Sequence, residues 1–279
     1  MGNYWRRRLA NYFFLGLCVA ATAVAVFPLL SILYYVVVRG VGVFSWEFLT
    51  QMPKPVGEPG GGMANAIVGT LIMVGLGALI GLPVGLMAGI YLAEYGRGRL
   101  AEGIRFCTDV FTGVPSVVLG VFVYTVLVKP MGGFSALAGG VALSLIIMPL
   151  VTRTSDEILR MVPSTLREAS LALGATKART IVSVVLRSAS GGVVTGIMLA
   201  VSRAAGETAP LLFTALNSRH WSLALGDPMA SLPVYIYTYA ISPFKDWQNQ
   251  AWGAALVLLL LVLILNLLAR VVSRGQYRY

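Results

Sequence analysis

Two charged residues, Arg203 and Glu207, stand in an otherwise apolar part of the chain, where they could bind a charged ligand. The stretch 188–206 is long enough to cross a bilayer, and Arg203 is its only charge. A spacing of four residues places both side chains on one helix face, where a carboxylate can neutralise a guanidinium. The forked donors of arginine also bind oxyanions, and ionisable groups inside membranes commonly mark a substrate path. The two interpretations are compatible, since Glu207 could hold Arg203 in place and accept a proton from a protonated oxyanion.

A second charged segment, 161–175, follows the fourth apolar stretch and has the pattern of a short amphipathic helix. Pro163 ends the preceding element, Ser164 can cap a new helix, and Gly174 permits a turn. One mostly apolar face is formed by Leu166, Ala169, Ser170 and Leu173. The polar face carries charges of both signs, so lipid headgroups and a protein partner are both suitable surfaces for this helix.

No residue pattern in the sequence indicates an enzyme. The apolar stretches contain no histidine, and the chain lacks a His-Glu-x-x-His motif and a Gly-x-x-x-x-Gly-Lys-Ser/Thr loop for a nucleotide. His220 stands alone, and Cys18 and Cys107 are far apart, which argues against a metal site or a disulfide. We therefore expect no catalytic residue and no cofactor bound by this chain. Any driving energy must come from an ion gradient or from a partner.

The elements that position these residues are membrane-spanning helices. Of the 279 residues 57% are hydrophobic and 11% charged, and the mean hydropathy is +0.81, which excludes a water-soluble domain. Stretches long enough to cross a hydrocarbon core of about 30 Å are 9–38, 63–93, 110–128, 130–152, 188–206 and 247–269. We predict an all-α polytopic membrane protein with six transmembrane helices.

The net charge of +10 is better explained by topology than by nucleic acid. With the N-terminus in the cytoplasm, most of the 21 Lys and Arg residues fall on the cytoplasmic side, as the positive-inside rule requires. The residues that fall outside are Arg39, Lys54, Lys129, Arg219 and Lys245. We expect both termini in the cytoplasm, the lipid bilayer as a partner, and no nucleic acid. The first apolar run is too long for a cleavable signal peptide.

Glycines and prolines give the spans their expected irregularities. Four glycines of the second stretch recur at a spacing of four residues: Gly77, Gly81, Gly85 and Gly89. Such a ladder leaves a flat face that another helix can approach closely, so we assign these residues to helix packing. Pro83 predicts a bend in the same span, and Pro115 and Pro149 predict irregular points in the next two.

The segment 208–250 cannot be one helix, because Pro210, Pro228, Pro233 and Pro243 divide it into short pieces. Its aromatic residues are Trp221, Tyr235, Tyr237, Tyr239, Phe244 and Trp247. Such a composition favours an interfacial belt. A docking surface for an external binding protein is the alternative.

The 161–175 segment resembles the cytoplasmic Glu-Ala-Ala loop of ABC-importer permeases. The residues that carry the likeness are Glu168, Ala169, Ser170, Gly174, Val184 and Leu186. Ser170 replaces the second alanine, and Arg187 stands where many members have proline. The resemblance implies a type I (MetI-like) ABC importer fold with a coupling helix at 164–178. In it Glu168, Ala169 and Gly174 would meet a cleft on an ATPase; a solvated carboxylate is the simpler account of Glu168.

Motifs along nearly the whole chain resemble the PstA-type permeases of phosphate ABC importers. They stand at 64–66, 89–96, 114–117 and 207–213, in the same order. The phosphate assignment depends on this resemblance, since the residues themselves indicate only a permease suited to an anion. By the same likeness Arg153 is a second candidate on the substrate path beside Arg203 and Glu207, although Arg153 is equally well explained as a positive-inside anchor.

The resemblance also implies the partners and the location of the chain. They are a second homologous permease (PstC-type), an ATPase dimer (PstB-type) that uses ATP and Mg, and a phosphate-binding protein (PstS-type), at the bacterial inner membrane. We divide the chain into an N-terminal part with the first helix and an outside loop (1–62), a transmembrane core (63–272) and a cytoplasmic tail (273–279). The alternatives are a permease for another oxyanion, such as molybdate or sulfate, and a non-transporting scaffold or sensor.

Overall fold

A computed structural model describes residues 2–55, 58 and 60–274, and within these ranges every regular element is helical. The elements are α1 (Gly2–Val41), α2 (Trp46–Thr50), α3 (Ala64–Glu94), α4 (Arg99–Gly113), α5 (Ser116–Val123), η1 (Tyr124–Val128), α6 (Lys129–Met131), α7 (Ala136–Arg160), α8 (Ser164–Ala172), α9 (Lys177–Thr180), η2 (Ile181–Val185), α10 (Leu186–Ala205), α11 (Ala209–Thr214), α12 (Leu232–Ala240) and α13 (Lys245–Arg274). Parts of the predicted outside loop (56, 57 and 59) and of the predicted tail (275–279) lie outside the described residues.

The described helices confirm the all-α membrane fold. Five of them are long and apolar enough to cross a bilayer, and the pair formed by α4 and the segment from α5 to α6 would be a sixth span if both parts cross together. This pair is bent by 103°. The bend follows from Pro115, because the residue before a proline avoids helical geometry, and Val114 is extended (φ −70°, ψ 130°). By contrast, α3 and α7 continue through Pro83 and Pro149.

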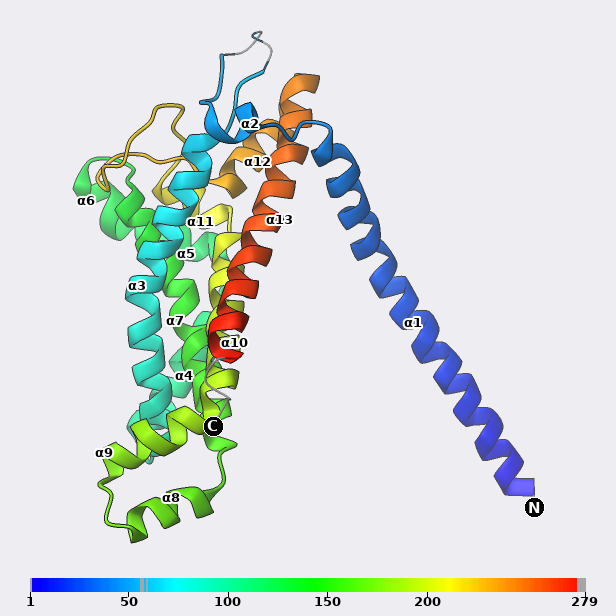
Figure 1. The fold of residues 1–279 in the computed structure, drawn as a ribbon, viewed down its shortest axis with the longest axis vertical. Coiled ribbons are helices and arrows are strands. Elements are labelled where there is room, and N and C mark those ends of the chain that lie inside the picture. Colours follow the sequence, from blue (N-terminus) through cyan, green and yellow to red (C-terminus); the bar gives the residue numbers. More distant parts are fainter. Residues whose placement is uncertain (1, 56–57, 59, 275–279) are drawn as a thin grey trace.

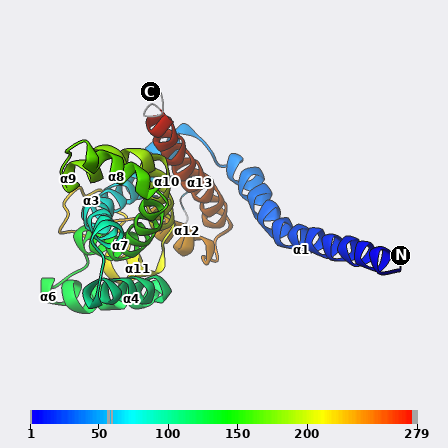
Figure 2. The same ribbon diagram turned by 90° about the horizontal axis from the view of Figure 1, so that it is seen from below.

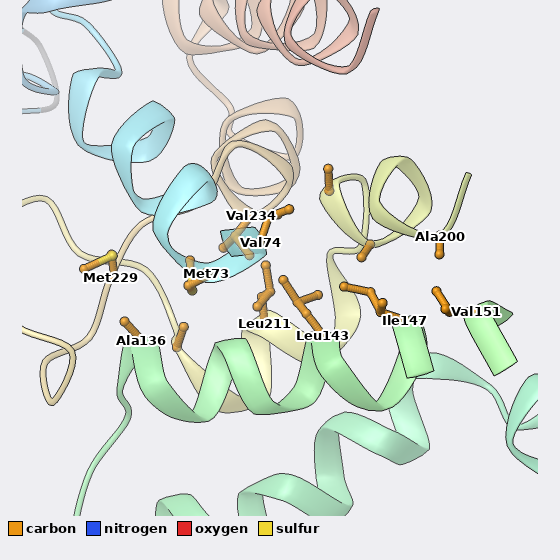
Figure 3. Packing of buried hydrophobic residues seen from close by; sticks show 13 residues of the cluster. Met73, Val74, Ala136, Leu143, Ile147, Val151, Ala200, Leu211, Met229 and Val234 are labelled. Carbon is orange, nitrogen blue, oxygen red and sulfur yellow. The ribbon is translucent and has the colours of Figure 1, made fainter. Parts of the chain in front are cut away.

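The centre of the bundle is the contact of α3 with α7. All four ladder glycines of α3 lie against α7, and the contact is so close that a side chain at any of these glycines would have no room. A Cβ added at Gly89 would lie 2.5 Å from Ser155 Cβ, and one at Gly85 would lie 2.8 Å from the Met148 carbonyl oxygen. Figure 3 shows the apolar layer beside this contact, where α7 projects Leu143, Ile147 and Val151 into the core. The close approach makes α3 and α7 one packed unit.

Helix α1 stands away from this bundle, as Figures 1 and 2 show. The most apolar window of α1 is 0% buried. Contact with the bundle is made near its end, where a Cβ added at Gly40 would lie 2.7 Å from Leu256 Cβ of α13. In this single chain, therefore, the apolar surface of α1 is left for lipid or for another subunit.

The aromatic residues of 208–250 correct part of the belt interpretation. Tyr235, Tyr239 and Trp247 are stacked on one another with centroid distances of 3.9 and 4.4 Å, and they are 1%, 2% and 8% exposed. Burial raises the pKa of the Tyr239 hydroxyl, which stays neutral. These rings form a packed core where α12 meets α13, whereas Trp221 and Tyr237 remain exposed.

Candidate substrate path and coupling surface

Arg203 and Glu207 come together at a break between two helices. The sequence predicted one helix face for both, but α10 ends at Ala205 with Gly206 as its cap, and Glu207 precedes α11. Across this break Arg203 Nε still lies 3.8 Å from Glu207 Oε1. The Arg203 side chain is 53% exposed and that of Glu207 is 17% exposed. The carboxylate is thus sheltered, whereas about half of the Arg203 side chain is exposed.

A small hollow adjoins this ion pair. Its walls are part polar and part apolar and come from both sides of the α4–α5 bend and from α7, including Phe111, Ser116 and Pro149. Its volume is about 20 Å³, which is room for about one water molecule. The exposed part of the Arg203 guanidinium can donate hydrogen bonds to an anion, although an oxyanion larger than water needs space beyond the hollow.

Arg153 lies elsewhere, in a wider cavity of about 170 Å³ that is lined mainly by charged residues, toward the α8 end of the bundle. Its Nε lies 3.0 Å from Glu157 Oε1, and its Nη1 lies 3.3 Å from Asp109 Oδ1 on α4. Two carboxylates already neutralise this arginine. The structure therefore does not bring Arg153 together with Arg203, and it leaves Arg153 less free to take an anion.

The predicted coupling segment, 164–178, is two short helices rather than one. Helix α8 ends at Ala172, and a turn with Gly174 at φ +81° leads to α9 at Lys177. Glycine suits this position because other residues rarely adopt a positive φ. Pro163, not Ser164, occupies the N-cap position, and Ser164 provides no side-chain cap.

Helix α8 forms a projecting tip at one end of the molecule (Figure 1). Leu173, which was predicted for the apolar face, is 89% exposed, and Leu166 and Leu171 are 42% and 47% exposed. Glu168 is also exposed, and among the described residues it has no hydrogen-bond or ion-pair partner. Exposed leucines clustered on a tip are typical of a protein-binding surface.

Two ion-pair groups with sheltered carboxylates at this end had no predicted role. Asp156 binds Arg105 of α4 at 3.1 Å and Arg160 at 2.6 Å, and Glu94 binds Arg167 at 2.6 Å. The i, i+4 spacing of Asp156 and Arg160 is a sequence signal for the first group. No spacing signal exists for the second, because Glu94 and Arg167 are 73 residues apart.

Comparison with known proteins identifies the family. Residues 81–276 match the family described as binding-protein-dependent transport system inner membrane component. The phosphate transport system permease protein PstA of Yersinia pestis is 47% identical over 96% of this chain and 91% of its own length. The chain belongs to the PstA family of permeases. The PstA proteins of Haemophilus influenzae and Mycobacterium tuberculosis H37Rv are 44% and 38% identical, each over 96% of this chain, and they are covered over 94% and 88% of their own lengths.

Solved structures support the fold independently. The inward-facing MetNI methionine ABC transporter contains a chain that superposes with a TM-score of 0.67. The match covers 77% of this chain and 96% of that one at 20% identity, so it shows the fold alone. The predictions of a MetI-like transmembrane domain and of a permease subunit of an ABC transporter are confirmed.

Proposed function

We propose that this chain moves inorganic phosphate across the cytoplasmic membrane as one half of a heterodimeric permease. The observation that carries this proposal is the placement of Arg203, half exposed among apolar helices and held beside the sheltered Glu207. A guanidinium there can bind phosphate oxygens through charge-assisted hydrogen bonds. The relatives named phosphate transport system permease supply the choice of phosphate over other oxyanions.

A second, PstC-type permease would complete the path. The hollow at Arg203 holds about 20 Å³ within this chain, so an oxyanion must be bound partly by another surface. The exposed side of Arg203 and the unburied length of α1 are surfaces that such a partner can cover. A PstS-type binding protein would deliver phosphate at the end opposite α8.

The α8 end is proposed to face the cytoplasm and a PstB-type ATPase dimer. Arg97, Arg99, Arg160 and Arg179 are exposed near this end, which suits the positive-inside rule. The ATPase would use ATP and Mg, so that this chain itself catalyses no reaction and binds no cofactor. Glu168, Ala169 and Gly174 would lie at the contact, with Leu173 as an apolar anchor.

The proposal is tested by reconstituting this chain with its three partner proteins in liposomes and measuring uptake of radiolabelled phosphate. We expect ATP-dependent uptake that unlabelled phosphate suppresses and that equal concentrations of sulfate or molybdate leave unchanged. Stronger competition by sulfate or molybdate would assign another oxyanion. ATP hydrolysis without any flux would favour a scaffold or sensor.

The coupling surface gives a separate prediction. Glu168→Lys reverses an exposed charge on α8, and we expect phosphate uptake to fall at least about tenfold through weaker ATPase docking. Co-purification of the ATPase and its phosphate-stimulated hydrolysis measure the effect. Glu102→Lys is the matched control, since Glu102 is an exposed acid in the first turn of α4. Equal behaviour of the two variants would leave Glu168 a solvated carboxylate.

A further inference from the structure

The last turn of α3 receives a partly buried arginine from α8. Glu94, the final residue of α3, has a side chain only 6% exposed. Its Oε1 accepts hydrogen bonds from both Nε (3.0 Å) and Nη2 (2.6 Å) of Arg167. Arg167 also donates to the carbonyl oxygens of Leu159 and Val162, at the end of α7. A single side chain of α8 therefore joins the ends of both helices of the central pair.

The segment after α8 is attached at the same place. Lys177, the first residue of α9, donates from Nζ to the carbonyl oxygen of Glu94 at 2.8 Å and lies 3.8 Å from the ring centroid of Tyr95. From Lys177 the chain runs through η2 and α10 without a break and reaches Arg203. The α8–α9 loop is thus tied to α3 on both sides and is continuous with the helix that carries the candidate substrate contact.

A neighbouring group attaches α4 to the same turn. Arg105 of α4 and Arg160 of α7 share the carboxylate of Asp156, and each also donates to the carbonyl oxygen of Leu92 at 3.0 Å. Cations near a helix C-terminus are favourable because its last carbonyls are unpaired. Helix α4 leads on to Phe111, which lines the hollow at Arg203. Displacement of the α3 terminus would therefore move both helices that flank the path.

Adjacent residues of α8 have opposite roles. The Arg167 side chain is 20% exposed and points into the bundle, whereas Glu168 is exposed and no described residue pairs with it. A buried ion pair adds little net stability compared with apolar residues of the same shape. Its directional hydrogen bonds do fix one geometry, because the planar guanidinium donates only along set directions.

We propose that Arg167 and Glu94 form the joint through which displacement of α8 reaches the substrate path. They are positioning residues, acting through α3, α7 and α10 rather than on phosphate. The inference rests on the proposed function, since it takes α8 to be moved by a partner ATPase. With the Arg167–Glu94 joint intact, α8 moves as one body with α3. Without the joint, the outward face of α8 still binds the ATPase, but displacement of α8 no longer moves the bundle.

The first test measures ATP hydrolysed per phosphate imported by the complete complex in liposomes. In Glu94→Gln and Arg167→Gln we expect normal assembly, ATPase activity within about twofold of wild type, and phosphate import at least about tenfold lower. The double variant should lose no more than either single one, because partners in one contact are not additive. Glu102→Gln is the control and should remain coupled. Normal phosphate import per ATP in both single variants would overturn the proposal that Arg167 and Glu94 form this joint.

A conservative variant covers the case in which the glutamine variants do not assemble. Arg167→Lys keeps the charge but loses the fork that spans Glu94 and the two carbonyls. We expect an assembled complex with import per ATP reduced severalfold. Full coupling in Arg167→Lys would show that the charge alone is sufficient and would overturn the joint as described.

The second test does not depend on phosphate. Spin labels at Leu173→Cys and Met87→Cys, both exposed, report the distance from the α8 tip to α3 in a Cys18→Ser, Cys107→Ser complex. We expect one distance with and without nucleotide, and a second, nucleotide-dependent distance after Glu94→Gln. A nucleotide-dependent change of about 5 Å or more, one helical turn, in the otherwise native complex would overturn the joint. A constant distance together with ATP hydrolysis but no phosphate flux would refute the proposed function alone.

Discussion

Replacing Arg203 by glutamine is expected to reduce phosphate uptake on the order of 100-fold while the complex still assembles. Glutamine can donate hydrogen bonds but carries no charge, and bonds to a charged group contribute about 1.5–3 kcal/mol. The change also leaves Glu207 without its cation, although Glu207 is only 17% exposed. Initial rates of radiolabelled phosphate uptake, together with pull-down of the other subunits, measure both outcomes.

Two further variants make the Arg203 result specific. Arg203→Lys keeps the positive charge but loses the forked donors of the guanidinium, and we expect this variant to retain part of the phosphate uptake. Arg39→Gln removes an exposed arginine at the end of α1, far along the chain from the hollow, and should leave uptake unchanged. Wild-type uptake by Arg203→Gln would remove this residue from the path.

The second large effect is expected from the glycine ladder. Gly89→Leu would place a side chain where a Cβ alone comes within 2.5 Å of Ser155 Cβ and 2.9 Å of the Thr152 carbonyl oxygen. Overpacking of this kind typically costs about 1–3 kcal/mol, and here the helices must separate. We expect a lower unfolding temperature in detergent and a much lower yield of assembled complex.

Gly75 offers a matched control on the same helix. It is exposed, and a Cβ added there would meet nothing within 4 Å. Gly75→Leu should therefore change the unfolding temperature of the isolated chain little. If both leucine variants unfold at the same temperature, close packing of α3 on α7 is not what requires Gly89.

Much of the fold could be predicted because hydropathy and small-residue spacing are local properties. The apolar stretches located the five long spanning helices, whereas the stretch 110–128 crosses the bend between α4 and α5. The irregular point predicted at Pro115 follows from the restriction that a proline places on the residue before it. The close contact at Gly77 to Gly89 agrees with their four-residue spacing. The division of the chain at 62 and 273 stays a prediction.

Other features depend on tertiary contacts that no spacing reveals. The ion pair of Glu94 with Arg167 forms only because α8, 73 residues further along the chain, lies against the C-terminal end of α3. Tyr235 and Trp247 stack because α12 and α13 pack together, so aromatic composition alone suggested an interfacial belt. The apolar stretch was predicted to end at 206, close to the observed end of α10, but the four-residue spacing of Arg203 and Glu207 suggested one shared helix and so missed that Glu207 lies beyond it.

The central claim is that Arg203 faces a water-filled path rather than lipid. Its most direct test is thiol accessibility of Arg203→Cys in the assembled complex, with Cys18→Ser and Cys107→Ser to remove the native thiols. We predict that a membrane-impermeant, charged thiol reagent modifies the introduced thiol, that the rate changes with nucleotide state, and that phosphate slows it. A thiol that stays unreactive in every nucleotide state, with or without phosphate, would contradict the account.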